Sequence, residues 1–448
     1  MKKLFGTDGV RGKANKYPIT AEIALKLGKA TAIVLTNGKK KPLFLIGKDT
    51  RASCYMLENA LTSGLTSMGA NVLLVGPCPT PGVAHLVRSF NADAGIMISA
   101  SHNPYMDNGI KFFDKKGYKL PDKIEAKIEN LVLNEDMKTD HINSDNIGRA
   151  KRIDDAQGRY IEFVKSSIKN ASLKDLKIVL DCANGAAYKV APLILSELGA
   201  RIIVLGNQPN GVNINKDCGA LHPDLVKTIV LKHKADAGIS LDGDADRIIM
   251  VDETGKIIDG DYILAIAALD MLKKDKLNKN TVVITEYTNL AFDELIKKHN
   301  GNVVRTKNGD RYVIEKMLKH NYNLGGEFSG HIIFSDYNST GDGMVAALQI
   351  LNIMKQTNKP LSRLASLLKK YPQVTVNVNV KEKKPLDKMT NVQREIKNAE
   401  NILGKKGRFI VRYSGTEMKA RVMIEGPNES IIKKLADNIA NEIKKEVG

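Results

Sequence analysis

The chain has 448 residues, and 43% of them are hydrophobic. This composition is typical of a globular protein and excludes a largely disordered one. A chain of this length is too long for a single hydrophobic core, so we expect three or four domains. The four cysteines are widely spaced and include no Cys-x-x-Cys pair, which predicts free, reduced thiols.

The formal net charge of +18 and the pI near 9.4 would suit a nucleic-acid-binding protein. However, the charge comes mainly from 53 Lys scattered along the chain, against 15 Arg. Scattered lysines usually solvate a surface, and an aromatic content of 5% without Trp offers little for base stacking. We therefore expect no nucleic-acid partner, and a basic polyanion-binding protein is only a remote alternative.

Met1–Phe5 is followed at once by Gly6-Thr7-Asp8-Gly9 rather than by an apolar segment. We therefore expect no secretory signal. The sequence also contains no uninterrupted run of about 18 apolar residues, the length that a transmembrane helix needs. These features predict a cytoplasmic protein without a membrane partner.

Strand-like apolar runs alternate with helical patterns in the first part of the chain. The runs cover residues 42–46, 71–75 and 95–98, and a helical pattern covers residues 56–68. Such alternation predicts a mostly parallel sheet with helices on both faces. The polar, Asn-rich segment 141–146 then has the composition of a linker.

The same pattern restarts twice, which predicts three successive α/β units. The later strand-like runs cover residues 176–180, 201–205, 281–285 and 302–304. Residues 374–380 differ, because they alternate strictly between apolar and polar types, as in a half-buried strand. A helical segment, two strands and a terminal helix should follow and complete a small α+β part.

Ser101 follows the apolar run at residues 95–98 and precedes Asn103-Pro104, which favours an extended or turn backbone over an immediate helix. Open α/β sheets bind ligands just beyond the carboxyl ends of such buried strands. No Gly-x-Ser-x-Gly segment surrounds this serine. Ser101 is therefore a candidate functional residue, with an ordinary Ser/Asn turn as the structural alternative.

Asp242, Asp244 and Asp246 lie between the apolar runs 238–241 and 248–251. In an extended chain these alternate positions share one face, so the three carboxylates could converge on one ion. A site made only of oxygen atoms favours Mg²⁺ or another hard divalent cation.

A calcium-binding loop is the alternative for this segment, because Glu253 is the twelfth residue counted from Asp242. Two features argue against it. Arg247 occupies the sixth position, where that loop needs glycine, and the flanking segments have the pattern of strands rather than helices.

Four separated motifs place polar residues in short segments along the chain. They are Ser101-His102-Asn103-Pro104, Asp242 to Arg247, Gly326 to His331 and Arg412 to Glu417. In this order they resemble the motifs of the α-D-phosphohexomutase family, and the resemblance extends from Phe5 to Gly426. Within the family, the chain is most similar to the bacterial members that act on glucosamine phosphate. This finer resemblance lies in Phe5 to Gly12, Gly47 to Arg51, Tyr55 to Glu58, Asn108 to Phe113, Gly309 to Val313 and Thr340 to Gly343.

The resemblance implies an α/β fold with three similar α/β domains, which have mixed, mostly parallel sheets, and a smaller C-terminal α+β domain around a central cleft. The expected boundaries are 1–150 for the domain with Ser101, 151–253 for a metal-binding domain, 254–370 for a sugar-binding domain and 371–448 for a phosphate-binding domain.

The resemblance also implies an isomerase that interconverts glucosamine 6-phosphate and glucosamine 1-phosphate. The reaction would pass through a phosphoserine enzyme and a glucosamine 1,6-bisphosphate intermediate, and would supply UDP-N-acetylglucosamine synthesis for peptidoglycan. A mannose- or glucose-phosphate mutase of the same family is the alternative. The expected partner is the hexosamine phosphate substrate, bound by a monomer or a homodimer.

By this resemblance Ser101 carries the phosphoryl group, and Ser101, Asp242, Asp244 and Asp246 hold one Mg²⁺ per active site. Arg11 and Lys111 are expected beside the phosphoserine as cations that stabilise the transition state and transfer protons. Lys111 would be the better base only if neighbouring positive charge lowered its pKa. Arg247 would orient the metal carboxylates. His102 and His331 compete for an acid/base role, and only His331 is retained for it.

Glu327 and Ser329 would bind the sugar, although a glycine-rich turn is the structural alternative for their segment. The phosphate that is not transferred would be bound by Arg412, Ser414, Gly415, Thr416 and Arg421.

Two residues depart from the family pattern. Phe328 lies where a polar residue is usual and puts the sugar preference in doubt, unless its side chain turns into the domain core. Met418 replaces a usual proline and should alter only loop stiffness.

Overall fold

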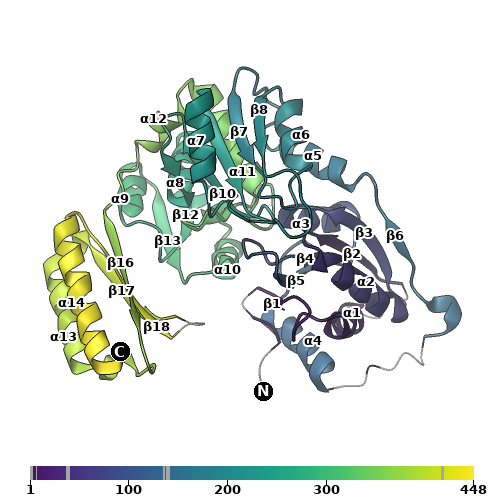
Figure 1. The fold of residues 1–448 in the computed structure, drawn as a ribbon. Helices are drawn as coiled ribbons and strands as arrows, with labels where there is room; N and C mark the ends of the chain where they lie inside the picture. The colour runs from purple at the N-terminus through teal and green to yellow at the C-terminus, as the bar shows by residue number, and fades with distance from the viewer. Residues whose placement is uncertain (1–3, 7, 37–40, 135–136, 138–141, 415–417) are drawn as a thin grey trace. The chain divides into compact units, whose positions relative to one another are not determined.

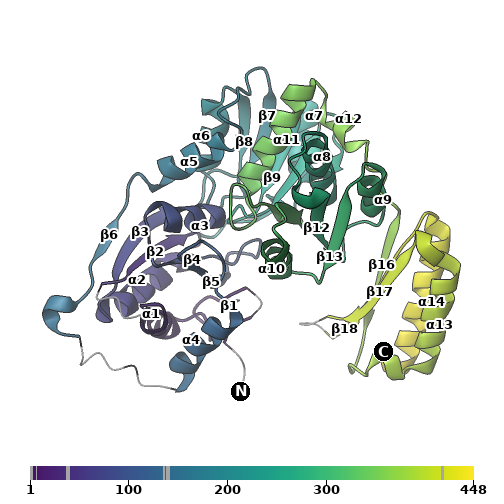
Figure 2. The ribbon, with the colours of Figure 1, turned by 180° about the vertical axis from the view of Figure 1, so that it is seen from behind.

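The computed structural model describes residues 4–6, 8–36, 41–134, 137, 142–414 and 418–448. It forms two compact units, coloured by residue number in Figures 1 and 2. The first unit comprises residues 1–287 and 299–367, and the second comprises residues 288–298 and 368–448. Within the described part of the chain, no helix is both long and apolar enough to span a membrane.

The first sheet of the larger unit has six strands in the order β1-β5-β4-β2-β3-β6. The strands are β1 (Val10–Lys13), β2 (Leu43–Lys48), β3 (Asn71–Pro77), β4 (Ala94–Ile98), β5 (Asp107–Asp114) and β6 (Ala150–Arg152). Strands β4, β2, β3 and β6 are parallel, whereas β5 and β1 are antiparallel to their neighbours. The runs expected at residues 42–46, 71–75 and 95–98 are therefore confirmed as neighbouring strands.

Helices bury both faces of this sheet. They are α1 (Ala21–Leu35), α2 (Ser53–Ser67), α3 (Thr80–Ser89) and α4 (Asp122–Asn134). Phe44 and Ile46 of β2 belong to the same core as α1 and α2, whereas Leu45 packs with α3 on the other face. Because successive side chains of a strand point to opposite faces, a strand buried on both sides must be apolar throughout.

The larger unit contains two further mixed sheets. One has the order β11-β10-β9-β7-β8 and the other β13-β12-β14-β15. Their strands are β7 (Lys177–Asp181), β8 (Arg201–Leu205), β9 (Ala237–Leu241), β10 (Ile248–Asp252), β11 (Ile257–Ile258), β12 (Thr281–Thr285), β13 (Asn302–Thr306), β14 (Leu324–Gly326) and β15 (Ile332–Phe334). Their helices are α5 (Ala156–Ser166), α6 (Val190–Glu197), α7 (Asp224–His233), α8 (Gly260–Lys273), α10 (Asp310–His320), α11 (Gly343–Thr357) and α12 (Leu361–Ala365).

The three sheets share one topological feature that positions the motifs. In each, a strand that runs parallel to one neighbour also pairs antiparallel with the strand that follows it in the chain, as β4 does with β5, β9 with β10, and β14 with β15. The connections of these three pairs contain Ser101, the three aspartates 242, 244 and 246, and Glu327 with Ser329. Three α/β units with mixed sheets are therefore confirmed, and each presents one motif from the same kind of connection.

The smaller unit has an antiparallel sheet in the order β16-β18-β17. Its strands are β16 (Gln373–Asn379), β17 (Arg408–Tyr413) and β18 (Lys419–Glu425), and its helices are α9 (Ala291–Lys298), α13 (Thr390–Leu403) and α14 (Glu429–Val447). Val378 and Val422 pack against Ile432 and Ile439 of α14 in its core. The alternating strand and the small α+β part expected here are confirmed.

The four cysteines are confirmed as free thiols, and all four are buried. Burial raises the pKa of Cys54 well above its usual value, and the nearby Asp49 carboxylate raises it further. The Cys54 thiol therefore stays protonated and unreactive.

Helices α1 and α2 approach each other so closely that only glycine fits at their contact. A Cβ atom on Gly64 would lie 2.2 Å from the carbonyl oxygen of Leu25. We expect Gly64→Ala to lower the free energy of unfolding by about 1–3 kcal/mol, because the helices must separate. Urea denaturation followed by circular dichroism measures this change.

Gly158→Ala is the matched control, because a Cβ atom at this position of α5 would meet nothing within 4 Å. Alanine is the better helix former, so the free energy of unfolding of this variant should rise by up to about 1 kcal/mol. Equal stability of the Gly64→Ala variant and the unmodified protein would contradict the close packing of α1 and α2.

Candidate active site

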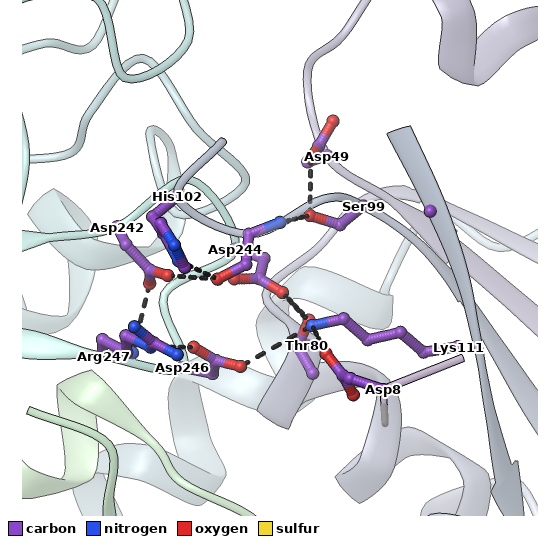
Figure 3. Close-up of polar contacts among 12 residues, drawn as sticks. Asp8, Asp49, Thr80, Ser99, His102, Lys111, Asp242, Asp244, Asp246 and Arg247 are labelled. Atoms are coloured by element: carbon purple, nitrogen blue, oxygen red, sulfur yellow. Dashed lines mark hydrogen bonds and ion pairs between the residues drawn. The ribbon is translucent and has the colours of Figure 1, made fainter. Parts of the chain in front are cut away.

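Ser101 lies in the connection between β4 and β5 with its backbone in the left-handed region, at φ 53°. Its side chain is buried, and its Oγ donates a hydrogen bond to Asp242 Oδ2 over 2.7 Å. The Ser101 N–H donates to Ser99 Oγ (2.9 Å). The Ser99 hydroxyl in turn donates to Asp49 Oδ2 (2.6 Å), as Figure 3 shows. A left-handed serine is unfavourable in isolation, so these contacts hold the hydroxyl in place.

The three carboxylates of Asp242, Asp244 and Asp246 converge, and each offers an oxygen within 4.8 Å of the others. They do so through a turn, and the expected extended backbone is wrong. The Ala245 N–H donates to the carbonyl oxygen of Asp242 (3.0 Å), and Ala245 has φ 57°. The Arg247 N–H donates to Asp242 Oδ1 (3.1 Å) and closes the turn. These two hydrogen bonds hold the chain in a turn, and the turn brings the carboxylates together.

The carboxylate cluster fits a divalent cation. Asp244 Oδ2 accepts hydrogen bonds from Thr80 Oγ1 (2.5 Å) and Lys111 Nζ (2.8 Å). Asp244 Oδ1 and Asp246 Oδ1 are buried and accept none from the described residues. Burial, followed by repulsion from Asp246 and Asp244, raises the pKa of Asp242 well above its usual range. A hard cation would satisfy these oxygens and relieve the repulsion.

Glu253 takes no part in this cluster, which excludes the calcium-loop alternative. Its carboxylate accepts hydrogen bonds from the backbone N–H (3.2 Å) and the hydroxyl of Ser362. The cluster is also flanked by the strands β9 and β10, whereas a calcium loop connects helices.

Lys111 lies among carboxylates rather than among cations. Its Nζ is 2.8 Å from Asp244, 3.4 Å from Asp8 and 3.7 Å from Asp246. Burial favours the neutral amine, but these three carboxylates outweigh burial and raise the pKa of Lys111. The condition under which Lys111 would be the better base, a pKa lowered by positive charge, is therefore not met in this structure.

Arg11 and Arg247 line the same cavity as Ser101. The Arg11 guanidinium donates to the Asp8 carboxylate. Arg247 Nε lies 3.9 Å from Asp246 Oδ1, so this side chain lies next to the carboxylate cluster. Both side chains therefore bring positive charge to the cavity that Ser101 also lines.

The two candidate histidines differ in their surroundings. The His102 Nδ1 is 3.3 Å from Ser101 Oγ, and burial together with Arg247 lowers the pKa of His102 to about 4. His331 is buried between Asp246 (3.7 Å) and Asp310 (3.6 Å). Burial opposes protonation of His331, but the two carboxylates outweigh it and raise its pKa. The Gly341 N–H donates to His331 Nε2 (3.1 Å), which places the proton of the neutral ring on Nδ1, toward Asp246.

A cavity of about 590 Å³ brings the motifs of the larger unit together. Its lining includes Arg11, Ser101, Asp246, Arg247, Glu327 and His331, which the sequence singled out. Glu327 Oε1 accepts from the Gly309 N–H (3.1 Å), and Ser329 Oγ donates to Glu327 Oε2 (3.0 Å). The cavity is large enough for a sugar phosphate.

The Phe328 side chain does not turn into the domain core. It is 43% exposed, and its ring centroid lies 6.2 Å from that of Tyr287. The backbone of this loop packs directly on Gly260, whose N–H donates to the Phe328 carbonyl oxygen (3.0 Å). A Cβ atom on Gly260 would lie 2.0 Å from the Glu327 carbonyl oxygen, so this close approach of the loop requires glycine at position 260.

In the smaller unit, Arg412 of β17 and Arg421 of β18 are direct cross-strand partners. Two guanidinium groups on one face of a sheet repel each other and suit an anion between them. Ser414 follows β17, and its carbonyl oxygen accepts from Lys383 Nζ (2.6 Å). Gly415 and Thr416 lie outside the described residues.

Several polar residues of the site carried no predicted role. Asp8 contacts Lys111 (3.4 Å) and Lys119 (2.5 Å), and Lys119 also pairs with Asp310 (2.5 Å). Asp8 lies in the segment Phe5 to Gly12, and Asp310 lies in the segment Gly309 to Val313. Both segments resemble the family, and this resemblance could have identified the two residues as part of the site. Thr80 and Lys119 lie outside every motif, and no sequence pattern marked them.

Comparison with known families assigns most of the chain. Residues 2–139, 158–255 and 259–371 match the alpha/beta/alpha domains I, II and III of phosphoglucomutase/phosphomannomutase, and residues 376–442 match the C-terminal domain. The chain therefore belongs to the phosphoglucomutase/phosphomannomutase family.

Individual relatives are similar over their full length. A phosphoglucosamine mutase of Geobacter metallireducens is 54% identical, with 100% of each chain covered. A phosphoglucosamine mutase of Protochlamydia amoebophila is 52% identical over 100% of this chain and 98% of its own.

The fold is shared with solved structures of lower identity. A phosphoglucomutase/phosphomannomutase family protein of Burkholderia thailandensis has a TM-score of 0.81 at 23% identity, covering 99% of this chain and 97% of its own. An N-acetylphosphoglucosamine mutase of Aspergillus fumigatus, solved with GlcNAc-6P and magnesium, has a TM-score of 0.67 at 19% identity. The match covers 99% of this chain and 95% of the Aspergillus chain.

The carboxylate cluster yields a direct test of metal binding. Asp246→Asn removes one negative charge while keeping the shape of the side chain. We expect Mn²⁺, used as a paramagnetic probe, to bind at least about tenfold more weakly, because one of three carboxylates is lost. Electron paramagnetic resonance of free Mn²⁺ measures the affinity.

Glu253→Gln is the control, because the Glu253 carboxylate hydrogen-bonds Ser362 and not the cluster. It should leave Mn²⁺ binding unchanged. Weaker binding in Glu253→Gln and normal binding in Asp246→Asn would reverse the assignment in favour of a calcium loop.

Proposed function

We propose that this chain is a phosphoglucosamine mutase, an isomerase that interconverts glucosamine 6-phosphate and glucosamine 1-phosphate. The observation that carries the chemistry is the buried Ser101 hydroxyl, 2.7 Å from Asp242 in a cluster of three carboxylates beside a cavity. The sugar is proposed from the relatives of 52–54% identity, which bear that name.

In this proposal phosphorylated Ser101 transfers its phosphoryl group to a hydroxyl of the bound sugar monophosphate. The bond between phosphorus and Ser101 Oγ breaks, a bond between phosphorus and the sugar oxygen forms, and the sugar hydroxyl loses its proton. The resulting 1,6-bisphosphate turns round in the cavity. The opposite phosphate then returns to Ser101, and the released sugar oxygen takes up a proton.

Asp242, Asp244 and Asp246 would hold one Mg²⁺ together with the Ser101 phosphate. When bound, Mg²⁺ supplies neutralising charge for the phosphoryl group in transfer. The support for this role is the set of buried carboxylate oxygens that lack hydrogen-bond donors among the described residues.

Arg11 and Lys111 would stabilise charge on the transferring group, as cations within a largely acidic site. Arg247 would orient the metal carboxylates through its backbone N–H, which donates to Asp242, and its guanidinium group, which lies near Asp246. His331 would contribute to proton transfer, since it lies between Asp246 and Asp310.

Glu327 and Ser329 would bind the sugar, and the Glu327 carboxylate could pair with the C2 ammonium group of glucosamine. Arg412, Ser414 and Arg421, with Gly415 and Thr416, would bind the phosphate that is not transferred. The opposed guanidinium groups of β17 and β18 support this anion site.

We further propose glucosamine 1,6-bisphosphate as the intermediate and activator, a monomer or homodimer as the assembly, and a cytoplasmic location. The product would enter UDP-N-acetylglucosamine synthesis. Domain boundaries at residues 150, 253 and 370 remain our proposal.

A phosphomannomutase or phosphoglucomutase is the second candidate. Phe328 favours it, because in the sequence this exposed residue lies between the two proposed sugar ligands, at a position where the resemblance implies a polar residue.

The phosphoryl carrier can be tested by mass spectrometry. We expect the protein incubated with glucose 1,6-bisphosphate to gain the mass of one phosphate on Ser101. Ser101→Ala should lose this mass and nearly all mutase activity, because Ser101 lines the cavity and its hydroxyl contacts Asp242, whereas the Thr80 hydroxyl on Asp244 does not line the cavity. A phosphate mapped to Ser99 would refute the assignment of the carrier.

Sugar preference decides between the two candidates. Pairing of Glu327 with an ammonium group could provide about 1–3 kcal/mol of discrimination over a hydroxyl group. We therefore expect kcat/KM to be at least about tenfold higher for glucosamine 6-phosphate than for glucose or mannose 6-phosphate. A coupled assay across these sugars measures the ratio, and a reversed preference would favour the second candidate while leaving the phosphoserine chemistry intact.

A further inference from the structure

Two side chains from different α/β domains donate to the same two carbonyl groups of the Ser101 loop. Arg51 Nη2 donates to the carbonyl oxygens of Ser101 (2.9 Å) and Asn103 (2.9 Å). Asn215 Nδ2 donates to the same two oxygens, each over 2.9 Å. Each carbonyl oxygen has two lone pairs, so both donors can bind at once.

The contribution of Arg51 is internal to the first domain. Its side chain is fully buried, its Nε donates to Asp49 Oδ2 (2.9 Å), and its Nη1 donates to the Pro104 carbonyl oxygen (2.6 Å). Asp49 also accepts the Ser99 hydroxyl. This network sets the conformation of the Ser101 loop itself.

Asn215 belongs to the second domain, and its loop lies against the carboxylate cluster. Its backbone N–H donates to the Ala183 carbonyl oxygen (2.9 Å). A Cβ atom added to Gly243 would lie 2.7 Å from the Ser101 carbonyl oxygen and 2.8 Å from Asn215 Nδ2. Gly243, between Asp242 and Asp244, therefore packs directly on this shared contact.

We infer that Asn215 is a positioning residue, which holds the Ser101 loop at a fixed position relative to the carboxylates of the second domain. This inference rests on the proposed phosphoserine chemistry. The carrier serine and the carboxylates come from different domains, so their alignment depends on how those domains dock. Phosphoryl transfer is sensitive to misplacements of about 1 Å.

Substitution of Asn215 should leave the docking of the two domains largely intact. Other contacts cross the same boundary, including Thr50 Oγ1 to the Asn184 carbonyl oxygen (2.5 Å) and the Ala52 N–H to the Gly211 carbonyl oxygen (2.9 Å). Asn215 has φ 57°, a conformation that Asp and Gly also adopt readily. Asn215→Asp and Asn215→Gly are therefore compatible with the local backbone.

Asn215→Asp is the sharper of the two variants, because it keeps the shape but replaces the shared N–H donor by an oxygen facing two carbonyl oxygens. We expect the rate of Ser101 phosphorylation by glucose 1,6-bisphosphate and kcat to fall between about tenfold and about a hundredfold. KM for glucosamine 6-phosphate should change less than about threefold, since Asn215 does not line the cavity. Asn215→Gly should show a smaller loss of the same kind.

Asn210→Asp is the matched control, the same substitution at an exposed position of the same loop. Asn210 Oδ1 accepts from the Val212 N–H (3.0 Å), which an aspartate also does. This variant should retain the labelling rate and kcat of the unmodified protein.

Rates per folded molecule that are equal in Asn215→Asp and Asn210→Asp would overturn the inference. So would a loss confined to thermal stability, or a KM effect that exceeds the kcat effect. If the unmodified protein is itself neither labelled nor active, the proposed function fails, which is a distinguishable result. If Asn215→Asp does not fold, Asn215→Gly gives the same comparison.

Discussion

The contact between the Ser101 hydroxyl and Asp242 is the interaction around which the larger unit is organised. It joins two domains, and it places a hydroxyl beside three carboxylates, where burial and then mutual repulsion raise the pKa of Asp242. Such a cluster is unfavourable unless cations approach it. Lys111 supplies one charge directly, and two carboxylate oxygens remain without donors among the described residues. A phosphoryl group on Ser101 would add further negative charge, so the proposed chemistry and the proposed cation require each other.

The third domain is connected to this cluster by alternating charges. Asp310 of α10 pairs with Lys119, Lys119 pairs with Asp8, and Asp8 pairs with Lys111, which reaches Asp244. Burial alone would raise the pKa of Asp8, but Lys111, Lys119 and Arg11 outweigh burial and lower it well below its usual range. Burial is likewise outweighed by opposite charges nearby, which lower the pKa of Asp310 and raise the pKa values of Lys111 and Lys119, so these groups hold one another in their charged forms. A change of charge at Asp310 in the third domain would consequently alter the electrostatic environment of Lys119 and, through Asp8, of Lys111.

The sequence predicted the apolar strands well, because strands buried on both faces are apolar throughout and end at recognisable turns. It therefore also predicted where Ser101 and the carboxylates stand relative to β4 and β9. It was wrong about the backbone between Asp242 and Asp246, since an alternating pattern of residues is equally compatible with an extended strand and with a turn closed by the Arg247 N–H. The surroundings of Lys111 depend on residues distant in sequence, and no local pattern reports them. Thr80 and Lys119 were missed for the same reason.

The three α/β domains explain why motifs of unrelated sequence meet at one cavity. In each sheet the motif occupies the connection between an inner strand and the antiparallel strand that follows it. The inner strands need only be apolar on both faces, so many different apolar sequences satisfy the same topology. The connections carry no common packing requirement, and each therefore has its own chemistry: a hydroxyl at Ser101, carboxylates at 242, 244 and 246, and the polar pair Glu327 and Ser329. Strands that need only be apolar, joined by connections that differ in chemistry, are expected to give a repeated fold without a detectable sequence repeat.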